Sequence, residues 1–504
     1  MRWLDGLLNR VTMYRLVLYY LIFLLGVAVT LSFTHVLAYD PYAILFSTAF
    51  LLAACVLINT IFARTFGVAT NVESAYISAL ILALIISPIQ GYADLWFLGW
   101  AAVLSMASKY ILAVRGKHLF NPVAFAVALT YLTTNQSASW WVGNAQMLPF
   151  VLIGGLILVR KLRRFDLVIS FALTALFVTV IGALFSGELL TKSLSGLLVY
   201  SPYFFFAFVM LTEPLTTPPS RRLRIVYGGL VGVIFSPAFH IGTIFLTPEL
   251  ALVVGNIFSY LVSPKTRLML HLKGRRQIAP NAYEFSFTPS RKLAYAPGQY
   301  MEWTLGHDDP DSRGNRRYFT LASSPTEPDL RLGVRFSNPS STFKQAMLSM
   351  DKNVEIAASQ VAGDFVLPHD PKQKCVFIAG GIGVTPFRSM IKYLLDMHQP
   401  RPITLFYSTH TVKDFVYKDV FDRAERELGI RTIYTVNDQS GIPRGWVGLV
   451  GRITPQIIQT YAPDFRNSIF YISGPIEMVN AFKDTLGQMG IPDSRIKVDF
   501  FAGL

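Results

Sequence analysis

A succession of long apolar runs fills the first half of the chain, and no other feature limits the fold as strongly. A helix needs roughly 20 mainly apolar residues to cross a bilayer. Such runs follow one another from about residue 14 to about residue 264, and charged residues are spread throughout the rest. The sequence therefore predicts an α-helical bundle of about ten transmembrane helices over residues 1–264, followed by globular domains. The expected spans begin near Tyr14, Tyr42, Asn71, Leu95, Leu119, Met147, Phe165, Ser195, Leu223 and Gly242.

Basic residues are distributed unevenly among the loops between these runs. One set of loops is rich in Lys and Arg, as at residues 160–164, whereas the alternate loops carry Asp40, Asp94 or Glu249. Cytoplasmic loops have an excess of Lys and Arg, so we expect a multi-pass membrane protein with both termini in the cytoplasm. This placement accounts for the net charge of +14 without nucleic acid, for which no recognisable module is present.

The supply of metal ligands is small. Two cysteines, Cys55 and Cys375, cannot hold an iron–sulfur cluster with four thiolates. The membrane half contains His35, His118 and His240 on different expected helices, so no helix offers a histidine pair for haem. We therefore expect no haem, no iron–sulfur cluster and no other metal site.

Several polar residues lie in or beside the apolar runs, where carboxylates are costly and usually functional. Glu213 stands in a segment of prolines and hydroxyl residues, 211–219, that should interrupt a helix. Asn121 precedes Pro122 at a second such break; both breaks could also be ordinary cytoplasmic helix ends. The candidates for a membrane relay are Asn121, Glu73, Glu213 and Glu249.

The membrane half resembles the RnfD/NqrB family, the flavin-bearing subunits of bacterial Rnf and sodium-pumping NADH:quinone oxidoreductase complexes. The resemblance rests on residues 120–125 and 210–218 and extends over about residues 10–264. The family attaches FMN covalently through a threonine in a Ser-Gly-Ala-Thr type motif, which the corresponding residues 133–141 lack. The resemblance therefore leaves open a non-covalently bound FMN or riboflavin, with no ligands assigned.

The second half reads as strands and turns first and as alternating strands and helices afterwards. This order predicts an antiparallel β-barrel over residues 268–370 and a doubly wound α/β domain over residues 371–504. The barrel segment contains Arg317, Phe319 and Thr320 on one expected strand. A guanidinium there can bind a pyrophosphate in a forked geometry, an aromatic ring can stack near an isoalloxazine, and a hydroxyl can reach flavin N5.

Two further motifs belong to the α/β domain. Residues 376–387 read as a buried strand, a glycine turn and a helix start, where a pyrophosphate can approach the backbone and meet a helix N-terminus. Residues 470–479 again read as strand, tight turn and helix, suited to holding a nicotinamide against the flavin. The C-terminal residues 499–501 could cover the flavin ring.

Residues 268–504 resemble the ferredoxin–NADP reductase superfamily, with Phe319 where Tyr is usual and Ser473 where Cys is usual. The resemblance implies FAD as cofactor and NADH or NADPH as substrate. Residues 407–413 show neither a clear arginine nor a clear carboxylate for the 2′ position, so the coenzyme stays open, with NADH slightly favoured. We expect catalytic roles for Thr320, Ser473, Asp499 and Phe501, and cofactor contacts from Arg317, Phe319, Thr320, Ser341, Thr342, Gly380, Gly381, Gly383, Thr385, Pro386, Gly474 and Pro475.

These patterns indicate an FAD-dependent NAD(P)H:acceptor oxidoreductase. We expect electrons to pass from cytoplasmic NAD(P)H through FAD into or across the membrane, to a quinone or an extracytoplasmic flavin-bearing protein. The expected partners are the lipid bilayer, that acceptor and further membrane subunits. Three alternatives remain: a quinone or ferric reductase that is only anchored, redox-driven Na⁺ or H⁺ translocation, and a transporter or sensor regulated by its nucleotide domain.

Overall fold

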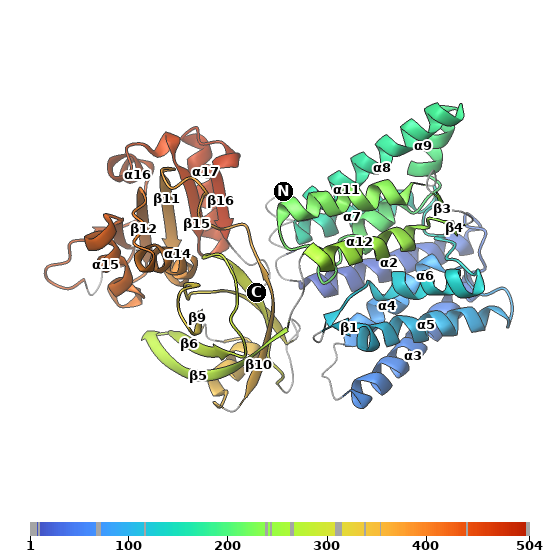
Figure 1. The fold of residues 1–504 in the computed structure, drawn as a ribbon, viewed down its shortest axis with the longest axis horizontal. Helices are drawn as coiled ribbons and strands as arrows, with labels where there is room; N and C mark the ends of the chain where they lie inside the picture. Colours follow the sequence, from blue (N-terminus) through green and yellow to red (C-terminus); the bar gives the residue numbers. More distant parts are fainter. Residues whose placement is uncertain are drawn as a thin grey trace. The chain divides into compact units, whose positions relative to one another are not determined.

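A helical unit, Met1–Thr266, is followed by a unit built on two sheets, Arg267–Ala502, in the computed structural model (Figure 1). The first unit has only two-residue strands besides its helices, within the part of the chain that the structure describes. The described residues are 8, 11–66, 72–114, 117–236, 240–241, 244–262, 267–307, 315–336, 339–352, 354–439 and 442–499.

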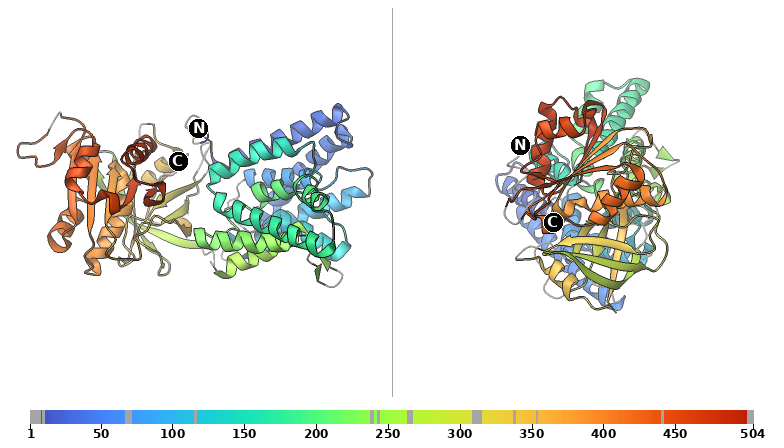
Figure 2. Two further views of the ribbon diagram at one scale, coloured as in Figure 1. Left: turned by 90° about the horizontal axis from the view of Figure 1, so that it is seen from above. Right: turned by 90° about the vertical axis from the view of Figure 1, so that its left-hand side faces the viewer.

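Helices lie at or near each expected span of the first unit, side by side as a bundle (Figure 2). Three of them, α2 (Met13–Phe33), α3 (Pro41–Thr65) and α8 (Phe165–Ser186), are long and apolar enough to cross a membrane. The pair Leu190–Leu198 and Tyr203–Met210, bent by 49°, would form a fourth span. The prediction of about ten full spans is therefore confirmed only in part, because the other described helices are shorter than the roughly 20 residues that a span needs. The expected starts Asn71 and Gly242 lie outside the described residues.

The remaining helices of the first unit range from single turns to 18 residues. They are α4 (Val72–Ile85), α5 (Asp94–Ile111), α6 (Pro122–Thr134), α7 (Leu148–Leu162), α9 (Leu190–Leu198), α10 (Tyr203–Phe205), the π-helix η1 (Phe206–Met210), α11 (Arg221–Phe235) and α12 (Pro248–Val262). The short strands are β1 (Ala113–Val114), β2 (Lys117–His118), β3 (His240–Ile241) and β4 (Ile244–Phe245).

Helix α4 shows why an apolar run need not form a full span. All of its residues from Ser78 to Ile85 are buried, as expected for a helix that is apolar on every side. Its final carbonyls are satisfied by a loop of the same unit. The Trp140 N–H donates to the Ile85 carbonyl (2.8 Å), and the Trp141 indole donates to the Ala83 carbonyl (2.9 Å). Because protein groups satisfy its backbone, α4 can end inside the unit.

The first sheet of the second unit has six antiparallel strands in the order β8-β7-β10-β5-β6-β9. Alternate residues of these strands, together with helix α13, enclose one apolar core. The antiparallel sheet is as predicted. Strands β8 and β9 are its two ends among the described residues, so closure into a barrel stays a prediction. The bounds are β5 (Arg267–Ala279), β6 (Ala282–Pro289), β7 (Tyr300–Thr304), β8 (Arg316–Thr320), β9 (Leu330–Arg335), α13 (Thr342–Ser349) and β10 (Glu355–Ala362).

The second sheet is parallel, in the order β14-β13-β12-β11-β15-β16, which confirms the predicted α/β arrangement. Helices α14 and α15 pack on one face, and α16 and α17 on the other (Figure 1). The strand order reverses between β11 and β15, and ligands of such sheets bind at the carboxyl ends of the strands beside that point. The bounds are β11 (Cys375–Gly380), the 3-10 turn η2 (Gly381–Val384), α14 (Thr385–Asp396), β12 (Ile403–Thr409), α15 (Lys418–Leu428), β13 (Arg431–Val436), β14 (Leu449–Val450), α16 (Pro455–Tyr461), β15 (Ile469–Ser473), α17 (Ile476–Gln488) and β16 (Ile496–Asp499).

Candidate active site

A pocket of about 1040 Å³ lies at the carboxyl ends of the parallel strands and reaches the end of strand β8. It joins all three motifs of this half, although the first and the third, represented by Thr320 and Ser473, are more than 150 positions apart in the sequence. Thr342 and Pro386 are not part of its lining, and Phe501 lies outside the described residues. The predicted residues that line the pocket are Arg317, Phe319, Thr320, Ser341, Gly380, Gly381, Gly383, Thr385, Ser473, Gly474, Pro475 and Asp499.

Arg317 brings a buried positive charge to this pocket. Its residue is 4% exposed, and its guanidinium lies 5.2 Å from the centre of the Phe343 ring. Phe343, on α13, also packs against Phe319, with ring centres 6.0 Å apart. Phe343 was not among the predicted site residues, because a core aromatic on a short helix carries no motif. Arg335 and Lys344 line the same pocket, so an anionic ligand would meet several cations there.

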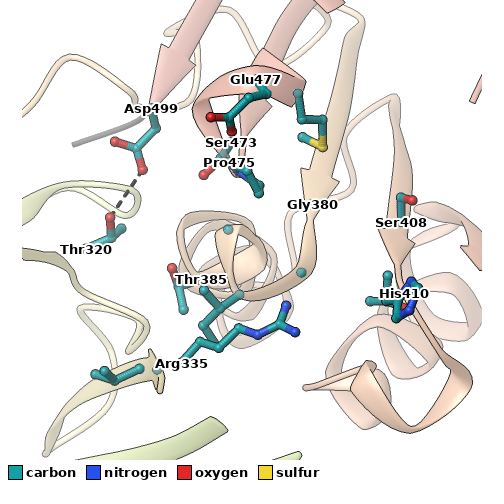
Figure 3. Close-up of a pocket in the computed structure, with 18 of the residues that line it drawn as sticks. Thr320, Arg335, Gly380, Thr385, Ser408, His410, Ser473, Pro475, Glu477 and Asp499 are labelled. Carbon is teal, nitrogen blue, oxygen red and sulfur yellow. Dashed lines mark hydrogen bonds between the residues drawn. The ribbon is translucent and has the colours of Figure 1, made fainter. Parts of the chain in front are cut away.

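Thr320 and Asp499 meet across the pocket although 179 positions separate them. Figure 3 shows the two side chains pointing toward each other. The Thr320 hydroxyl donates to a carboxylate oxygen of Asp499 over 3.2 Å, and the two residues are 7% and 8% exposed. The hydroxyl is thereby held with its oxygen available to a group in the pocket and its hydrogen on a carboxylate.

The glycine turn and the turn after β15 approach each other through their backbones. A Cβ atom on Gly383 would lie 2.6 Å from the Gly474 nitrogen and from the Ser473 carbonyl oxygen. Gly381 has a φ of +53°, a left-handed conformation that favours glycine. Thr385, 7% exposed, then begins helix α14, whose N-terminus attracts negative charge. These features form a cradle into which a phosphate-bearing ligand can come close.

The other end of the pocket lies at the carboxyl ends of β12 and β13. Ser408 lies near the end of β12 and His410 follows that strand (Figure 3). Asn437 follows β13, and Arg452 comes from the segment after β14. His410 lies 4.0 Å from Asp438. Sequence reasoning missed Arg452, because an exposed arginine between short elements has no pattern that points to a pocket.

The four relay candidates of the first unit each have partners within that unit. Glu249 is 1% exposed and accepts a hydrogen bond from the Trp140 indole over 3.0 Å. A buried carboxylate on an apolar helix remains a marker of function. Glu73 accepts a hydrogen bond from Arg15 over 3.0 Å. Glu213 lies 3.4 Å from His118 and accepts a hydrogen bond from the Thr216 hydroxyl over 2.9 Å. The Asn121 backbone N–H donates to the Asn256 side chain over 2.8 Å.

Comparison with known proteins bears on the second unit. Residues 377–484 match the family model of the oxidoreductase NAD-binding domain. The chain is 27% identical over 227 residues to the stachydrine N-demethylase reductase subunit Stc4 of Rhizobium meliloti, covering 44% of this chain and 63% of that protein. It is 25% identical over 229 residues to the NAD(P)H-flavin reductase of Vibrio harveyi, covering 43% of this chain and 90% of that protein.

A solved structure of the cytochrome P450 reductase GcoB of Amycolatopsis is also similar, with 22% identity, coverage of 47% of this chain and 70% of that chain, and a TM-score of 0.42. The chain spans 53% to 63% of the length of the first curated relatives that it matches. The second unit thus contains an oxidoreductase NAD-binding domain and is similar to NAD(P)H-dependent reductases, and its homologues are oxidoreductases, as predicted. The RnfD/NqrB resemblance of the first unit stays a prediction.

Proposed function

We propose that the chain is an FAD-dependent NAD(P)H:acceptor oxidoreductase that delivers electrons to its membrane half. The observation that carries this proposal is that Arg317, Phe319 and Thr320 line the same pocket as the glycine turn 380–383. A flavin and a nicotinamide must lie against each other for hydride transfer, and this pocket offers both binding patterns in one space of about 1040 Å³.

The residues present fit FAD and a nicotinamide dinucleotide. Arg317 would bind the flavin pyrophosphate and Phe319 would pack near the flavin ring. The glycine turn and the N-terminus of α14 would hold the nicotinamide pyrophosphate, while Ser473 and Gly474 would position the nicotinamide. FAD bound here would supply an N5 atom that accepts hydride and a ring that can release electrons singly.

Thr320 and Asp499 would carry a proton away from flavin N5. The Thr320 oxygen can accept a hydrogen bond from an N–H group in the pocket while its own hydrogen points to Asp499. The pair therefore offers a two-step route for a proton from the pocket to a carboxylate.

Because a proton leaves N5 when the reduced flavin passes its electrons on, replacing the hydroxyl by a methyl group in Thr320→Val should slow reoxidation of the NAD(P)H-reduced flavin by an electron acceptor about 10- to 100-fold, with FAD content unchanged. Stopped-flow absorbance of the purified full chain measures the rate. Thr320→Ser keeps the hydroxyl and serves as the control, with a rate within about threefold of wild type. A Thr320→Val rate equal to that of wild type would show that the hydroxyl has no part in the reaction.

The coenzyme preference should depend on Arg452. An arginine near the ribose accommodates a 2′-phosphate, whereas a carboxylate favours a free 2′-hydroxyl. Residues 407–413 slightly favoured NADH, but Arg452 in the pocket lining revises that expectation: NADPH should be used at least as well as NADH. Arg452→Glu should lower kcat/KM for NADPH about tenfold with little change for NADH. The control is Arg444→Glu, which reverses an exposed charge of a neighbouring loop outside the pocket lining. Equal losses with both coenzymes would disprove 2′-phosphate recognition by Arg452.

The membrane half would accept the electrons, either for a quinone or for an extracytoplasmic flavin-bearing protein. Support comes from the three described helices of spanning length and from the loop charges, which predict cytoplasmic termini. The resemblance to RnfD/NqrB adds to this support and implies the bacterial cytoplasmic (inner) membrane. The test is a flavin inventory of the purified full chain, by acid extraction and chromatography. FAD together with FMN or riboflavin supports a relay through the membrane, whereas FAD alone supports an anchored quinone or ferric reductase.

Ion translocation is a second candidate, favoured by the buried carboxylate of Glu249. Proteoliposomes oxidising NAD(P)H would then take up or expel Na⁺ or H⁺, and Glu249→Gln would abolish the flux while leaving reduction of FAD intact. Electron transfer to an acceptor trapped inside the vesicles, with no ion flux in wild type, would eliminate this candidate.

A further inference from the structure

A short segment, residues 321–327, is fastened to helix α14 by hydrogen bonds. The Arg388 guanidinium donates to the Ala322 carbonyl over 3.0 Å, and the Ser389 hydroxyl donates to the Ser323 carbonyl over 2.6 Å. Arg388 also donates two hydrogen bonds to the carboxylate of Glu327, one of them 2.9 Å long. The two side chains of this ion pair are 5% and 10% exposed.

The Arg388–Glu327 pair is the centre of a larger charge network. Arg331, on β9, lies 3.4 Å from the Glu327 carboxylate and donates to Glu284, on β6, over 3.2 Å. Arg388 also lies 5.6 Å from the centre of the Tyr417 ring, just before α15. Burial alone would raise the pKa of Glu327, but Arg388 lowers that pKa below its ordinary value, so the carboxyl is ionised. The network therefore consists of charged groups held between the first sheet and helix α14.

Stability gives little reason for such a network. Removing two charges from water costs about as much free energy as their attraction returns, and apolar residues of similar volume are often equally stable. What a buried, forked arginine–carboxylate pair provides is a defined geometry. Such a geometry fixes the two parts of the unit that the pair connects.

The two ends of the network lie next to the two binding patterns of the pocket. Residue 321 follows Thr320 directly, at the end of the strand that carries Arg317 and Phe319. Arg388 lies in the first turn of α14, which begins at Thr385 immediately after the glycine turn. A shift of either end would thus move one half of the pocket against the other.

We propose that Arg388 and Glu327 are positioning residues that set the nicotinamide-binding half of the pocket against the flavin-binding half. This inference rests on the proposed function and adds a device by which the module fixes the distance between the two reacting rings. Neither residue is part of the pocket lining. Because misplacement by about 1 Å can cost 100-fold in rate, a small change in this contact is sufficient to slow hydride transfer.

The main test is the full-length double variant Glu327→Gln/Arg388→Met, which removes both charges together. We expect a melting temperature and FAD content near those of wild type, because no unpaired charge is left buried. Flavin reduction should slow about 10- to 100-fold, and the long-wavelength absorbance of a stacked nicotinamide–flavin pair should weaken. Hydrogen–deuterium exchange should rise in residues 321–327 and 385–396, a readout that needs no activity.

The matched control removes an exposed pair of the same kind. Arg423 and Glu427 are 2.6 Å apart on the surface of α15, so Arg423→Gln/Glu427→Gln should change neither rate nor exchange. A second test variant, Glu327→Asp, keeps the charge but shortens the side chain, and it should slow reduction about threefold or more with FAD retained.

Wild-type rates and exchange in both test variants would overturn the proposal. So would a loss of rate that is fully explained by lost FAD or unfolding in both variants, since the pair would then be a stabilising contact only. A wild-type protein without FAD would instead contradict the proposed function, whatever the variants do.

Discussion

Arg317→Ala is expected to purify with less than about a tenth of the FAD of wild type. The substitution removes a buried guanidinium that lines the pocket and lies over the Phe343 ring. Two charge-assisted hydrogen bonds to a pyrophosphate would be lost, at about 3 kcal/mol of binding free energy, which raises the Kd for FAD roughly 100-fold. Extracted flavin per mole of protein measures the content, and titration of the flavin-free protein with FAD gives the Kd.

The neighbouring Arg316 offers a matched control for this prediction. It lies on the same strand but outside the pocket lining, with its guanidinium 3.6 Å from Glu302. Arg316→Gln keeps a hydrogen-bond donor for that carboxylate and should retain full FAD content. Full FAD in Arg317→Ala, or equal loss in both variants, would mean that Arg317 does not hold the pyrophosphate.

The division into a helical half and a sheet-containing half could be predicted because it depends on local composition and on hydrophobic periodicity. The lengths of the helices could not. Helix α4 ends at Ile85 because the Trp140 N–H and the Trp141 indole satisfy its last carbonyls, from more than 50 positions away. An apolar run shows that a segment avoids water, but not where another loop of the protein ends its helix.

In the candidate site, too, some features could be predicted from the sequence and others could not. The glycine turn and the strand of Arg317 could be identified because a few adjacent residues carry all of the groups that would bind the cofactors. The pairing of Thr320 with Asp499 joins strands of the two sheets, and the contact of Glu327 with Arg388 joins the segment after β8 to helix α14. Neither has a local pattern, since an isolated Glu or Asp reads as an ordinary surface residue until the fold brings its partner to it.

Gly383→Ala should lower the rate of flavin reduction by NAD(P)H about 100-fold while the protein keeps its FAD. The added Cβ would lie 2.6 Å from the backbone of Gly474 and Ser473, well inside the normal contact distance. Backbone atoms cannot turn away as a flexible side chain can, so the two turns that form the nucleotide cradle must separate. A displacement of about 1 Å there is expected to misplace the nicotinamide, and overpacking should cost about 1–3 kcal/mol of unfolding free energy.

Gly487→Ala separates this local clash from any general effect of removing a glycine. Gly487 lies in α17, the helix that follows the Ser473–Gly474 turn, and nothing lies within 4 Å of its added Cβ. Alanine should there raise helix stability by about 0.5–1 kcal/mol and leave the reduction rate unchanged. Stopped-flow rates, FAD content and urea unfolding of the two variants therefore give opposite expectations. If Gly383→Ala were reduced as fast as Gly487→Ala, the close approach of the two turns would not be required for nucleotide binding, and the nicotinamide would have to lie elsewhere in the pocket.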